Sequence, residues 1–401
     1  MQAQTDKTTK LKKIILTTVL SIIAVLMWLG IYVLRRYVST EPVTAETLKQ
    51  LKLPPGFVIS IYAHVPNARQ LAAGPDGLMF VGSRENTKVH VIGANKVVSK
   101  ARQPAGQTSD TEPEVIAIDG FDRPNGVAYK DGTLYIAEIS RILKIDNIAK
   151  TYKDSPVPQE YVGGLPGESH HGWKYIRFSP DGTLFTAQGM PCNVCEKDNP
   201  IYGTILSLDS KKKWQPYASG VRNSVGFDWQ PGSGDLWFTD NGRDFLGDDL
   251  PPDELNHATK AGQHFGFPYR YGDNQPDPDF GSKRAADLNA TFVTPAAKLG
   301  AHVASLGMRF NHSKNFPPQY KGSIFIAEHG SWNRSSPTGY RVMRVHFEGD
   351  KPIYEPFITG WQKPDGAPWG RPVDLEFVGD DLFISDDFAG LVYKVSYVGS
   401  N

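Results

Sequence analysis

Cysteine, basic runs and nucleotide-binding motifs are scarce or missing in this chain of 401 residues. Its 2 cysteines form one Cys192-Asn-Val-Cys195 pair, with no following His for haem attachment and no second pair for a zinc site. Basic and acidic residues balance at 43 each, and no basic run lies outside the N-terminus, which argues against nucleic acid as a partner. The sequence also lacks G-x-G-x-x-G after a strand, a P-loop, H-E-x-x-H and G-x-S-x-G. Nicotinamide, nucleotide and serine-hydrolase chemistries therefore lose support.

Turn-forming and aromatic residues are abundant. The chain has 39 Gly and 30 Pro, and 11% of its residues are aromatic. This composition suits many short strands joined by tight turns better than long helices. We expect an all-β fold.

An apolar run from Ile14 to Leu34 carries no charged residue and is long enough to cross a bilayer core, which takes about 20 residues. Lysines precede the run and two arginines follow it, so the positive-inside bias favours a cytoplasmic N-terminus. A cleaved signal peptide is the competing interpretation, but no small-x-small site follows closely. The predicted organisation is a cytoplasmic segment 1–13, a single-pass signal anchor 14–34 in the inner membrane, a linker 35–54 and a periplasmic domain 55–401.

One unit recurs along the domain: a strand, a turn rich in Asp and Gly, and a strand that begins with an aliphatic-aromatic pair. The six copies span residues 73–80, 128–135, 178–185, 232–237, 320–325 and 378–383. Their spacing is roughly 50 to 58 residues, with one gap of nearly 90, which suits four-stranded propeller blades with one long insertion. We predict a six-bladed β-propeller, whereas separate sandwich domains would not explain a shared repeat.

The ends of such a propeller must meet or be covered. The strand at 57–62 can complete the last blade by pairing with residues 391–395, so both ends of the chain would close the ring. The long insertion is expected between residues 245 and 305.

Polar residues precede the inner strands of consecutive repeats. His171 precedes the third, and a neutral imidazole is a natural base for a hydroxyl proton. Arg222 and Asn223 precede the fourth, where a guanidinium and an amide would bind an anionic oxygen. Taken singly, these residues equally suit a surface histidine pair, a structural salt bridge and a turn cap.

Two further stretches carry charge. The loop Asp240-Asn-Gly-Arg243 is followed by several acidic residues and offers oxygen ligands to a hard cation such as calcium, without EF-hand spacing. The fifth repeat has Glu328-His-Gly-Ser-Trp-Asn-Arg334, and the sixth has Arg371. Arginines that converge on the channel would suit a ligand with several carboxylates. Cys192 and Cys195 could form a disulfide outside the cytoplasm, with free thiols or a redox role as alternatives.

From about residue 55 to the C-terminus, the chain resembles the family of soluble glucose dehydrogenases and sorbosone dehydrogenases that use pyrroloquinoline quinone (PQQ), and its sorbosone branch most closely. The resemblance implies a catalytic base at His171 and an Arg222–Asn223 pair beside the quinone oxygens. It implies calcium held by the Asp240-to-Arg243 loop, with ligands at Asp240, Gly242 and Arg243. Cofactor-binding positions are implied at Asn125, Lys174, Asn223, His329, Arg334 and Arg371.

This resemblance implies oxidation of a sugar, or of a sugar-derived aldehyde or alcohol, by hydride transfer to the quinone, with Arg222 stabilising the developing charge. The glucose branch has Gln-Asn-Gly in its second blade where this chain has Pro124-Asn-Gly126, which puts glucose itself in doubt. Reoxidation would need a membrane quinone or a cytochrome. A metal-dependent lactonase-type propeller and a non-catalytic anchored binding module are the alternatives.

Overall fold

The computed structural model describes residues 18–23, 25, 27, 42–84, 87–93, 113–282 and 291–399. The chain divides into two compact units, Met1–Pro42 and Val43–Asn401. In the first unit, residues 18–23 are helical. Most of the predicted span Ile14–Leu34 lies outside the described residues, and no helix within the described ranges combines the length and apolar character that a bilayer crossing requires.

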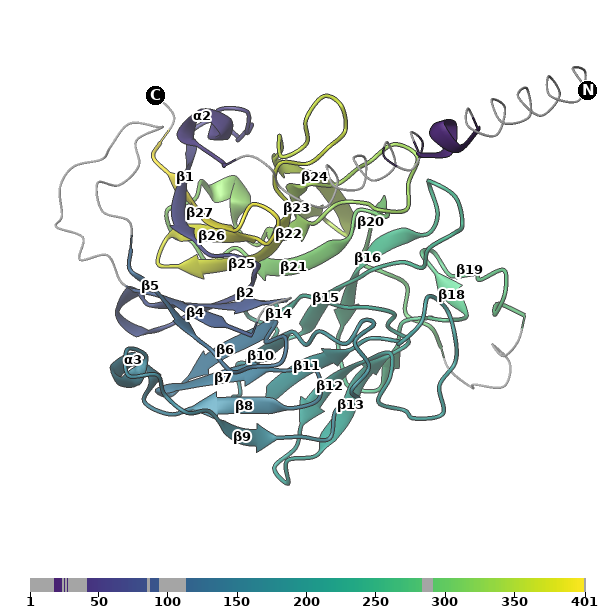
Figure 1. Ribbon diagram of the computed structural model, residues 1–401. Helices are drawn as coiled ribbons and strands as arrows, with labels where there is room; N and C mark the ends of the chain where they lie inside the picture. The colour runs from purple at the N-terminus through teal and green to yellow at the C-terminus, as the bar shows by residue number, and fades with distance from the viewer. Residues whose placement is uncertain are drawn as a thin grey trace, which may run out of the picture. The chain divides into compact units, whose positions relative to one another are not determined.

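The second unit contains six blades, each built on four antiparallel strands over the described residues (Figure 1). Blades 1 to 3 comprise β2 (Ala68–Ala73), β3 (Met79–Ser83), β4 (Val89–Ile92) and β5 (Val115–Ile118); β6 (Gly126–Lys130), β7 (Thr133–Ala137), β8 (Ile142–Ile145) and β9 (Gln159–Val162); and β10 (Ile176–Phe178), β11 (Leu184–Gln188), β12 (Thr204–Leu208) and β13 (Trp214–Ser219). Blades 4 to 6 comprise β14 (Phe227–Trp229), β15 (Leu236–Asp240), β16 (Pro252–Ala258) and β20 (Ala297–Ala301); β21 (Ser305–Phe310), β22 (Ile324–Glu328), β23 (Arg341–Glu348) and β24 (Lys351–Ile358); and β25 (Pro372–Val378), β26 (Asp381–Asp386), β27 (Leu391–Tyr397) and β1 (Phe57–His64). The predicted six-bladed propeller is confirmed.

The two ends of this unit close the ring. β1 pairs antiparallel with β27, from Phe57 opposite Tyr397 to His64 opposite Leu391. Figure 1 shows the purple β1 beside the yellow β27. The predicted closure is confirmed, and it leaves the last blade with strands from both ends of the chain.

The hydrophobic core lies between neighbouring blades. Six clusters of buried side chains, counted over the described residues, each join two adjacent blades around the ring. Side chains alternate between the two faces of a strand. Leu134 and Ile136 of β7 therefore pack towards blade 1, while Tyr135 packs towards blade 3. Because both faces of a blade are covered, its strands are apolar on both sides.

The Asp-Gly turns of the repeat are hairpin turns between the first two strands of a blade. In blade 2, Lys130 pairs with Thr133 across a two-residue turn. Its Asp131 has φ 49° and its Gly132 has φ 86°. A two-residue hairpin of this kind requires two residues with positive φ, which explains Asp-Gly at this place.

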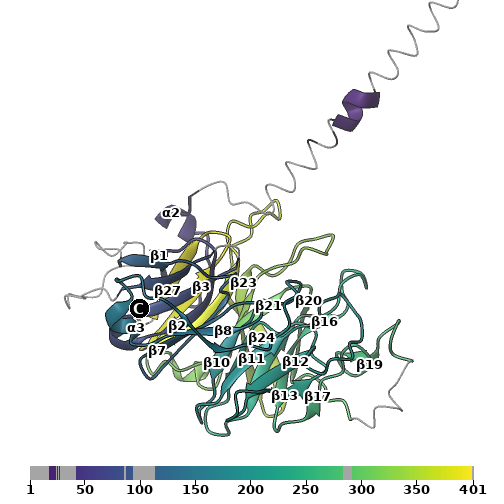
Figure 2. The same cartoon turned by 60° about the horizontal axis from the view of Figure 1, so that its bottom comes forward.

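The remaining helices and strands of the described residues are short. They are α2 (Ala45–Leu48), η1 (Pro75–Gly77), α3 (Ile148–Thr151), β17 (Gln263–His264), β18 (Arg270–Tyr271), β19 (Gln275–Pro276) and η2 (Pro318–Tyr320). In the predicted linker 35–54, α2 begins with a Thr44 capping box and Leu51 is buried in a core cluster, so the propeller unit begins before residue 55. The insertion adds β17 as a fifth, parallel strand to blade 3 (Figure 2) and carries the β18–β19 hairpin (Figure 1).

Candidate active site

A cavity of about 340 Å³ lies where the first strands of several blades begin and the second strands end. Neighbouring strands of a blade are antiparallel, so these two points fall at the same end of the sheet. The volume lies within the range of small-molecule sites, roughly 300–1,000 Å³. Its polar lining includes the side chains of Arg69, Arg84, His171, Arg222, Asn223 and His329, together with the carboxylates of Asp244 and Asp253.

His171 lies in the turn before β10 and lines the cavity. Its Nδ1 is 2.8 Å from the carbonyl oxygen of Met190. A carbonyl only accepts, so Nδ1 carries the proton and Nε2 is unprotonated. Burial, followed by the charges of Arg222 and His170, lowers the pKa of His171 to about 3. The imidazole is therefore neutral at physiological pH and can accept a proton.

A glycine lets His171 sit close to the next strand. Gly189 directly follows β11, and a Cβ there would come within 2.7 Å of the His171 Cβ and 2.8 Å of its carbonyl oxygen. Neither atom can move without the turn that carries the imidazole. We expect any side chain at this position to displace the base.

Arg222 and Asn223 form the turn before β14, and Asp240 at the end of β15 holds that turn. The backbone N–H groups of Arg222 and Asn223 donate to its two carboxylate oxygens at 2.9 and 2.7 Å. Burial raises the pKa of Asp240 to about 7, although both hydrogen bonds favour the ionised form. The Arg222 guanidinium contacts Asp244 Oδ2 at 3.0 Å. The structure thus gives Asp240, predicted as a metal ligand, a positioning contact with the Arg–Asn pair.

The loop 241–244 presents its backbone to the cavity. Gly242 lines the cavity, and its N–H donates to Asp253 Oδ1 at 3.0 Å. The Arg243 guanidinium instead bonds Asp277 at 2.9 Å and Asp279 at 2.8 Å. The described ranges contain no group of three or more His, Cys, Asp or Glu side chains that could hold a metal. A hard cation at this loop would rely on backbone carbonyl oxygens, which calcium accepts as ligands.

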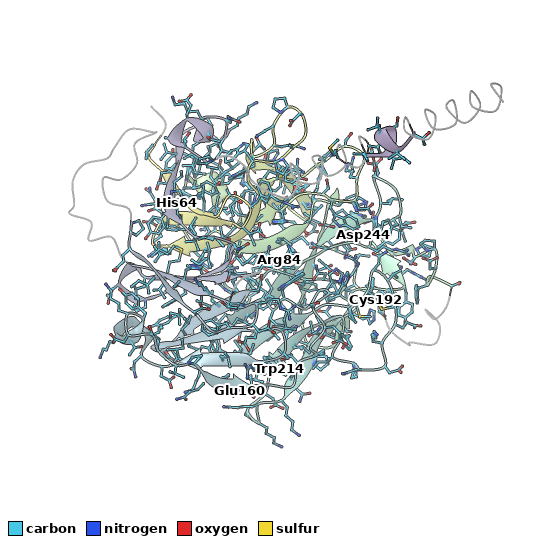
Figure 3. All side chains as sticks on the ribbon, viewed as in Figure 1. His64, Arg84, Glu160, Cys192, Trp214 and Asp244 are labelled. Atoms are coloured by element: carbon cyan, nitrogen blue, oxygen red, sulfur yellow. A yellow bond between two sulfur atoms is a disulfide. The ribbon has the colours of Figure 1, made fainter. Side chains whose placement is uncertain are left out.

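The side of the cavity opposite this loop carries two arginines that the sequence motifs did not identify. Arg69 of β2 donates to Asn125 Oδ1 at 2.8 Å and to Asp387 Oδ2 at 3.0 Å. Asp387 also lies 2.7 Å from His329 Nε2, so one carboxylate contacts both the Arg69 guanidinium and the His329 imidazole. The Arg84 guanidinium lies over the Trp173 ring, 4.2 Å from its centroid. Figure 3 labels Arg84 among the blades.

Alignment of the repeats offers a signal for Arg84. It directly follows β3, the second strand of its blade, as Asn241 follows β15, His329 follows β22 and Asp387 follows β26. The same position therefore carries a polar side chain at or beside the cavity in four blades. Arg69 lacks such a signal, because it lies inside β2.

Two predicted cofactor residues lie outside the cavity lining. The Asn125 amide donates to the carbonyl of Lys174 at 2.9 Å. The Lys174 ammonium is buried and donates to the carbonyl of Gly172 at 2.5 Å. Burial lowers the pKa of Lys174 to about 7. Both residues support the turn that carries His171.

Arg371 and Arg334 also lie outside the lining. Arg371 donates to the carbonyls of His329 and Gly330, each at 2.9 Å. Arg334 donates to the carbonyl of Asp248 and pairs with the carboxylate of Asp249 at 3.1 Å. Their contact with a cofactor stays a prediction.

The cavity suits an anionic ligand rich in acceptors. Three guanidinium groups line it, those of Arg69, Arg84 and Arg222. The Trp173 Nε1–H is buried and has no acceptor within the described part of the chain. Guanidinium groups match planar carboxylates in geometry and charge. A ligand with several carboxylates, as PQQ has, therefore fits this donor set.

The two cysteines are bonded. Cys192 and Cys195 form a disulfide between β11 and β12, which decides between the alternatives left open by the sequence. The pair is half-buried. Its ring contains Asn193, which contacts Arg222.

Comparison with known proteins identifies relatives over most of the chain. An uncharacterized protein of Borreliella burgdorferi is 35% identical over 379 residues, covering 90% of this chain and 94% of that protein. The TrAA12-like family matches residues 207–360. A PQQ-dependent pyranose dehydrogenase of Coprinopsis cinerea is 27% identical over 149 residues, which cover 32% of this chain and 20% of that enzyme.

Solved structures share the fold. The holo PQQ domain of the Coprinopsis cinerea pyranose dehydrogenase superposes with a TM-score of 0.68 at 17% identity, covering 86% of this chain and 97% of that domain. A calcium structure of a Trichoderma reesei protein of carbohydrate-active enzyme family AA12 gives a TM-score of 0.68 at 20% identity, covering 90% of this chain and 99% of that one. The propeller expected from the sequence resemblance is thus the fold of PQQ sugar dehydrogenases.

Proposed function

We propose that this chain, which belongs to the same family as the Borreliella burgdorferi protein and shares its fold with the PQQ-dependent sugar dehydrogenases, is itself an oxidoreductase that oxidises a sugar with PQQ and calcium. One observation carries the proposal. An unprotonated imidazole nitrogen and three guanidinium groups converge on one cavity of about 340 Å³. A base beside a cationic site that can bind several carboxylates is what alcohol oxidation by a carboxylated quinone requires.

The cavity residues divide the work of binding and proton transfer. Arg69, Arg84 and Arg222 would hold the carboxylates and a quinone oxygen, and backbone oxygens of Gly242 and Arg243 would hold the calcium. When bound, PQQ would supply the acceptor for a hydride, which carries the two electrons of the oxidation. His171 Nε2 takes the substrate hydroxyl proton, while Nδ1 stays fixed on the Met190 carbonyl.

Arg222 supplies positive charge next to that base. Its guanidinium is buried, so its field is weakly screened by water and acts on the charge that develops during oxidation. The same charge lowers the pKa of His171. An anionic ligand on Arg222 would offset that effect and make His171 a stronger base when the site is loaded.

The substrate class we propose is an aldose-like or sorbosone-like sugar, or an aldehyde or alcohol derived from one. Half-exposed Trp332 lines the cavity, and Phe245 meets its ring edge-on with centroids 5.9 Å apart. An aromatic surface at the mouth suits the apolar face of a sugar ring.

The test is dye reduction by the purified full-length chain with PQQ and calcium. The panel holds aldoses, sorbosone, simple alcohols and a set of lactones, with controls that omit PQQ or replace calcium by a chelator. Turnover of a sugar that needs both cofactors supports the proposal. Lactone hydrolysis without PQQ would indicate the hydrolase alternative, and failure to bind PQQ at all would leave a binding module.

We also propose that residues 14–34 anchor the propeller to the inner membrane, on the periplasmic side, where a membrane quinone or a cytochrome would reoxidise the cofactor. The Cys192–Cys195 disulfide supports an oxidising compartment. Protease digestion of spheroplasts tests this arrangement. Cleavage of the propeller in intact spheroplasts, with retention in the membrane after alkaline washing, is the expected outcome, and protection from protease would contradict it.

A further inference from the structure

The Cys192–Cys195 disulfide closes a small ring in the loop between β11 and β12. Figure 3 labels Cys192 and Asp244 on the same side of the molecule. Both cysteines are half-buried, so a small reductant can reach the bond. The 2 cysteines of the chain are both in this bond, so a thiol reductant has a single target in this protein.

Asn193, inside the ring, binds two other segments. Its carbonyl oxygen accepts from Arg222 Nε at 2.8 Å, and its Oδ1 accepts from Arg222 Nη2 at 3.0 Å. The same Oδ1 accepts from the Asp244 N–H at 2.8 Å, while Nδ2 donates to the Asp244 carbonyl at 3.2 Å. One residue therefore connects the disulfide ring, the cavity guanidinium and the loop 241–244.

These contacts decide how well Arg222 is fixed. A free arginine side chain has many rotamers, and ordering one costs up to about 2 kcal/mol of conformational entropy. Two of the guanidinium nitrogens of Arg222 rest on Asn193, and Nη2 also pairs with Asp244, which Asn193 itself holds. The placement of Arg222 thus depends on where the ring holds Asn193.

We propose that Asn193 is the positioning residue for Arg222 and for the loop 241–244, and that the Cys192–Cys195 bond fixes Asn193, so that reduction of the bond loosens this side of the cavity. The consequence for the cofactor rests on the proposed function. A dithiol would supply the two electrons and two protons: its own sulfurs become a disulfide, and the Cys192–Cys195 bond breaks to give two thiols.

Hydrogen exchange of the full-length chain without cofactor tests the positioning directly. The Asp244 amide should exchange about tenfold faster in Asn193→Ala and in wild type treated with a dithiol, because its acceptor is lost or mobile. Val194→Ala is the matched control, since it lies in the same ring and removes no polar atom. Asn193→Asp keeps an acceptor for Arg222 and should recover part of the protection.

The second readout is the affinity for PQQ, followed by quenching of tryptophan fluorescence. We expect Kd to rise about tenfold in Asn193→Ala and in the reduced wild type, and to change less than about twofold in Val194→Ala. The double variant Cys192→Ser/Cys195→Ser should match the reduced wild type and no longer respond to the dithiol. If the disulfide had only a stabilising role, its reduction would lower the unfolding temperature and leave Asp244 exchange and the Kd for PQQ unchanged.

Unchanged Asp244 exchange after confirmed reduction would overturn the proposal, whatever the cofactor. Faster exchange together with weaker PQQ binding supports it in full. Faster exchange in a chain whose oxidised form binds no PQQ would leave the positioning role standing and refute the proposed function instead.

Discussion

Two walls of the cavity differ in how far along the chain their contacts reach. The central wall consists of His171, Arg222 and Asn223, from blades 3 and 4. The closing wall consists of Arg69, Arg84 and His329, where blades 1 and 5 meet the last blade. Hydrogen-bond partners in the central wall lie 17 to 29 residues apart. In the closing wall they lie 56, 58 and 318 residues apart.

This difference separates the proton acceptor from the arginines of the closing wall. The proton acceptor His171 is held by a local turn and by the nearby Met190 carbonyl of the same blade. The closing wall depends on Asp387, which lies between β26 and β27 of the last blade and accepts from Arg69 of blade 1. We therefore expect a change of the base His171 to affect turnover and changes in the closing wall to affect affinity for the cofactor, whereas Arg222 contributes to both.

The largest expected effect is that of His171→Gln. Glutamine can still donate a hydrogen bond to the Met190 carbonyl but offers no base at physiological pH. We expect kcat to fall by about 10²- to 10⁴-fold, the usual contribution of a general base, with PQQ affinity nearly unchanged. Steady-state dye reduction and PQQ titration measure the two quantities.

His170→Gln is the matched control, because His170 also lines the cavity, and its effect should stay within a few fold. The pH profile adds a check. Burial and Arg222 lower the pKa of His171 to about 3, so its base form persists far below neutral pH. Activity should show no acid limb from His171 between pH 8 and 5. Equal losses in both variants would refute the assignment of the base.

Arg84→Gln tests the closing wall. The variant removes one cationic donor from the cavity, so we expect the Kd for PQQ to rise about 10- to 100-fold, as for a lost charge-assisted hydrogen bond. With saturating PQQ, kcat should change little, because His171 and Arg222 remain in place. Fluorescence titration at two salt concentrations measures the loss, which should be larger at low salt.

Arg123→Gln removes the same charge from an exposed pair with Asp122 and serves as the control for Arg84→Gln. If both variants bind PQQ as tightly as wild type, the closing wall does not bind the anion. The proposed difference in role between the central wall and the closing wall would then be wrong.

The same difference explains what the sequence could predict. The six repeats were visible because each consists of a hairpin whose glycine-containing turn and alternating strands are local. His171, Arg222 and Asn223 were visible because they stand just before inner strands. The insertion was located, but its parallel strand β17 was not, since a two-residue strand carries no pattern of its own.

Arg69 was missed because its partners lie in other blades. Nothing near it in sequence indicates that Asp387 will accept from its guanidinium. From the sequence, Arg334 and Arg371 looked as suitable for binding a cofactor carboxylate as Arg222. In the structure, Arg334 donates to the backbone carbonyl of Asp248 and Arg371 donates to that of His329. Sequence distance, rather than residue type, limited the prediction of the site.

Lys174→Met concerns the support beneath the central wall. Burial lowers the pKa of Lys174 from 10.5 to about 7, so the folded protein releases a proton that the unfolded chain binds between these values. Below about pH 7 the folded protein therefore bears the full cost of burying the charged ammonium. Its free energy of unfolding rises as the pH increases from about 7 to 10.5. We expect Lys174→Met to stabilise the protein by about 1–3 kcal/mol at pH 6 and by less at pH 10.

Denaturant unfolding of both proteins at pH 6, 8 and 10, without cofactor, measures this dependence. A variant that is less stable at pH 6 would show that the ammonium is paired. The same variant tests the predicted cofactor contact, because loss of PQQ affinity would mean that Lys174 reaches a carboxylate when the site is loaded.

The smallest expected effect is that of Arg334→Ala. Arg334 lies outside the cavity lining, so this variant contrasts it with the arginines that line the cavity. Arg334 pairs with the exposed carboxylate of Asp249, and such surface pairs contribute about 0–1 kcal/mol. We expect less than about a threefold change in PQQ affinity, against the larger loss in Arg84→Gln. A loss as large as that of Arg84→Gln would show that Arg334 turns from Asp249 to the cofactor, which would extend anion binding from the closing wall to the rim.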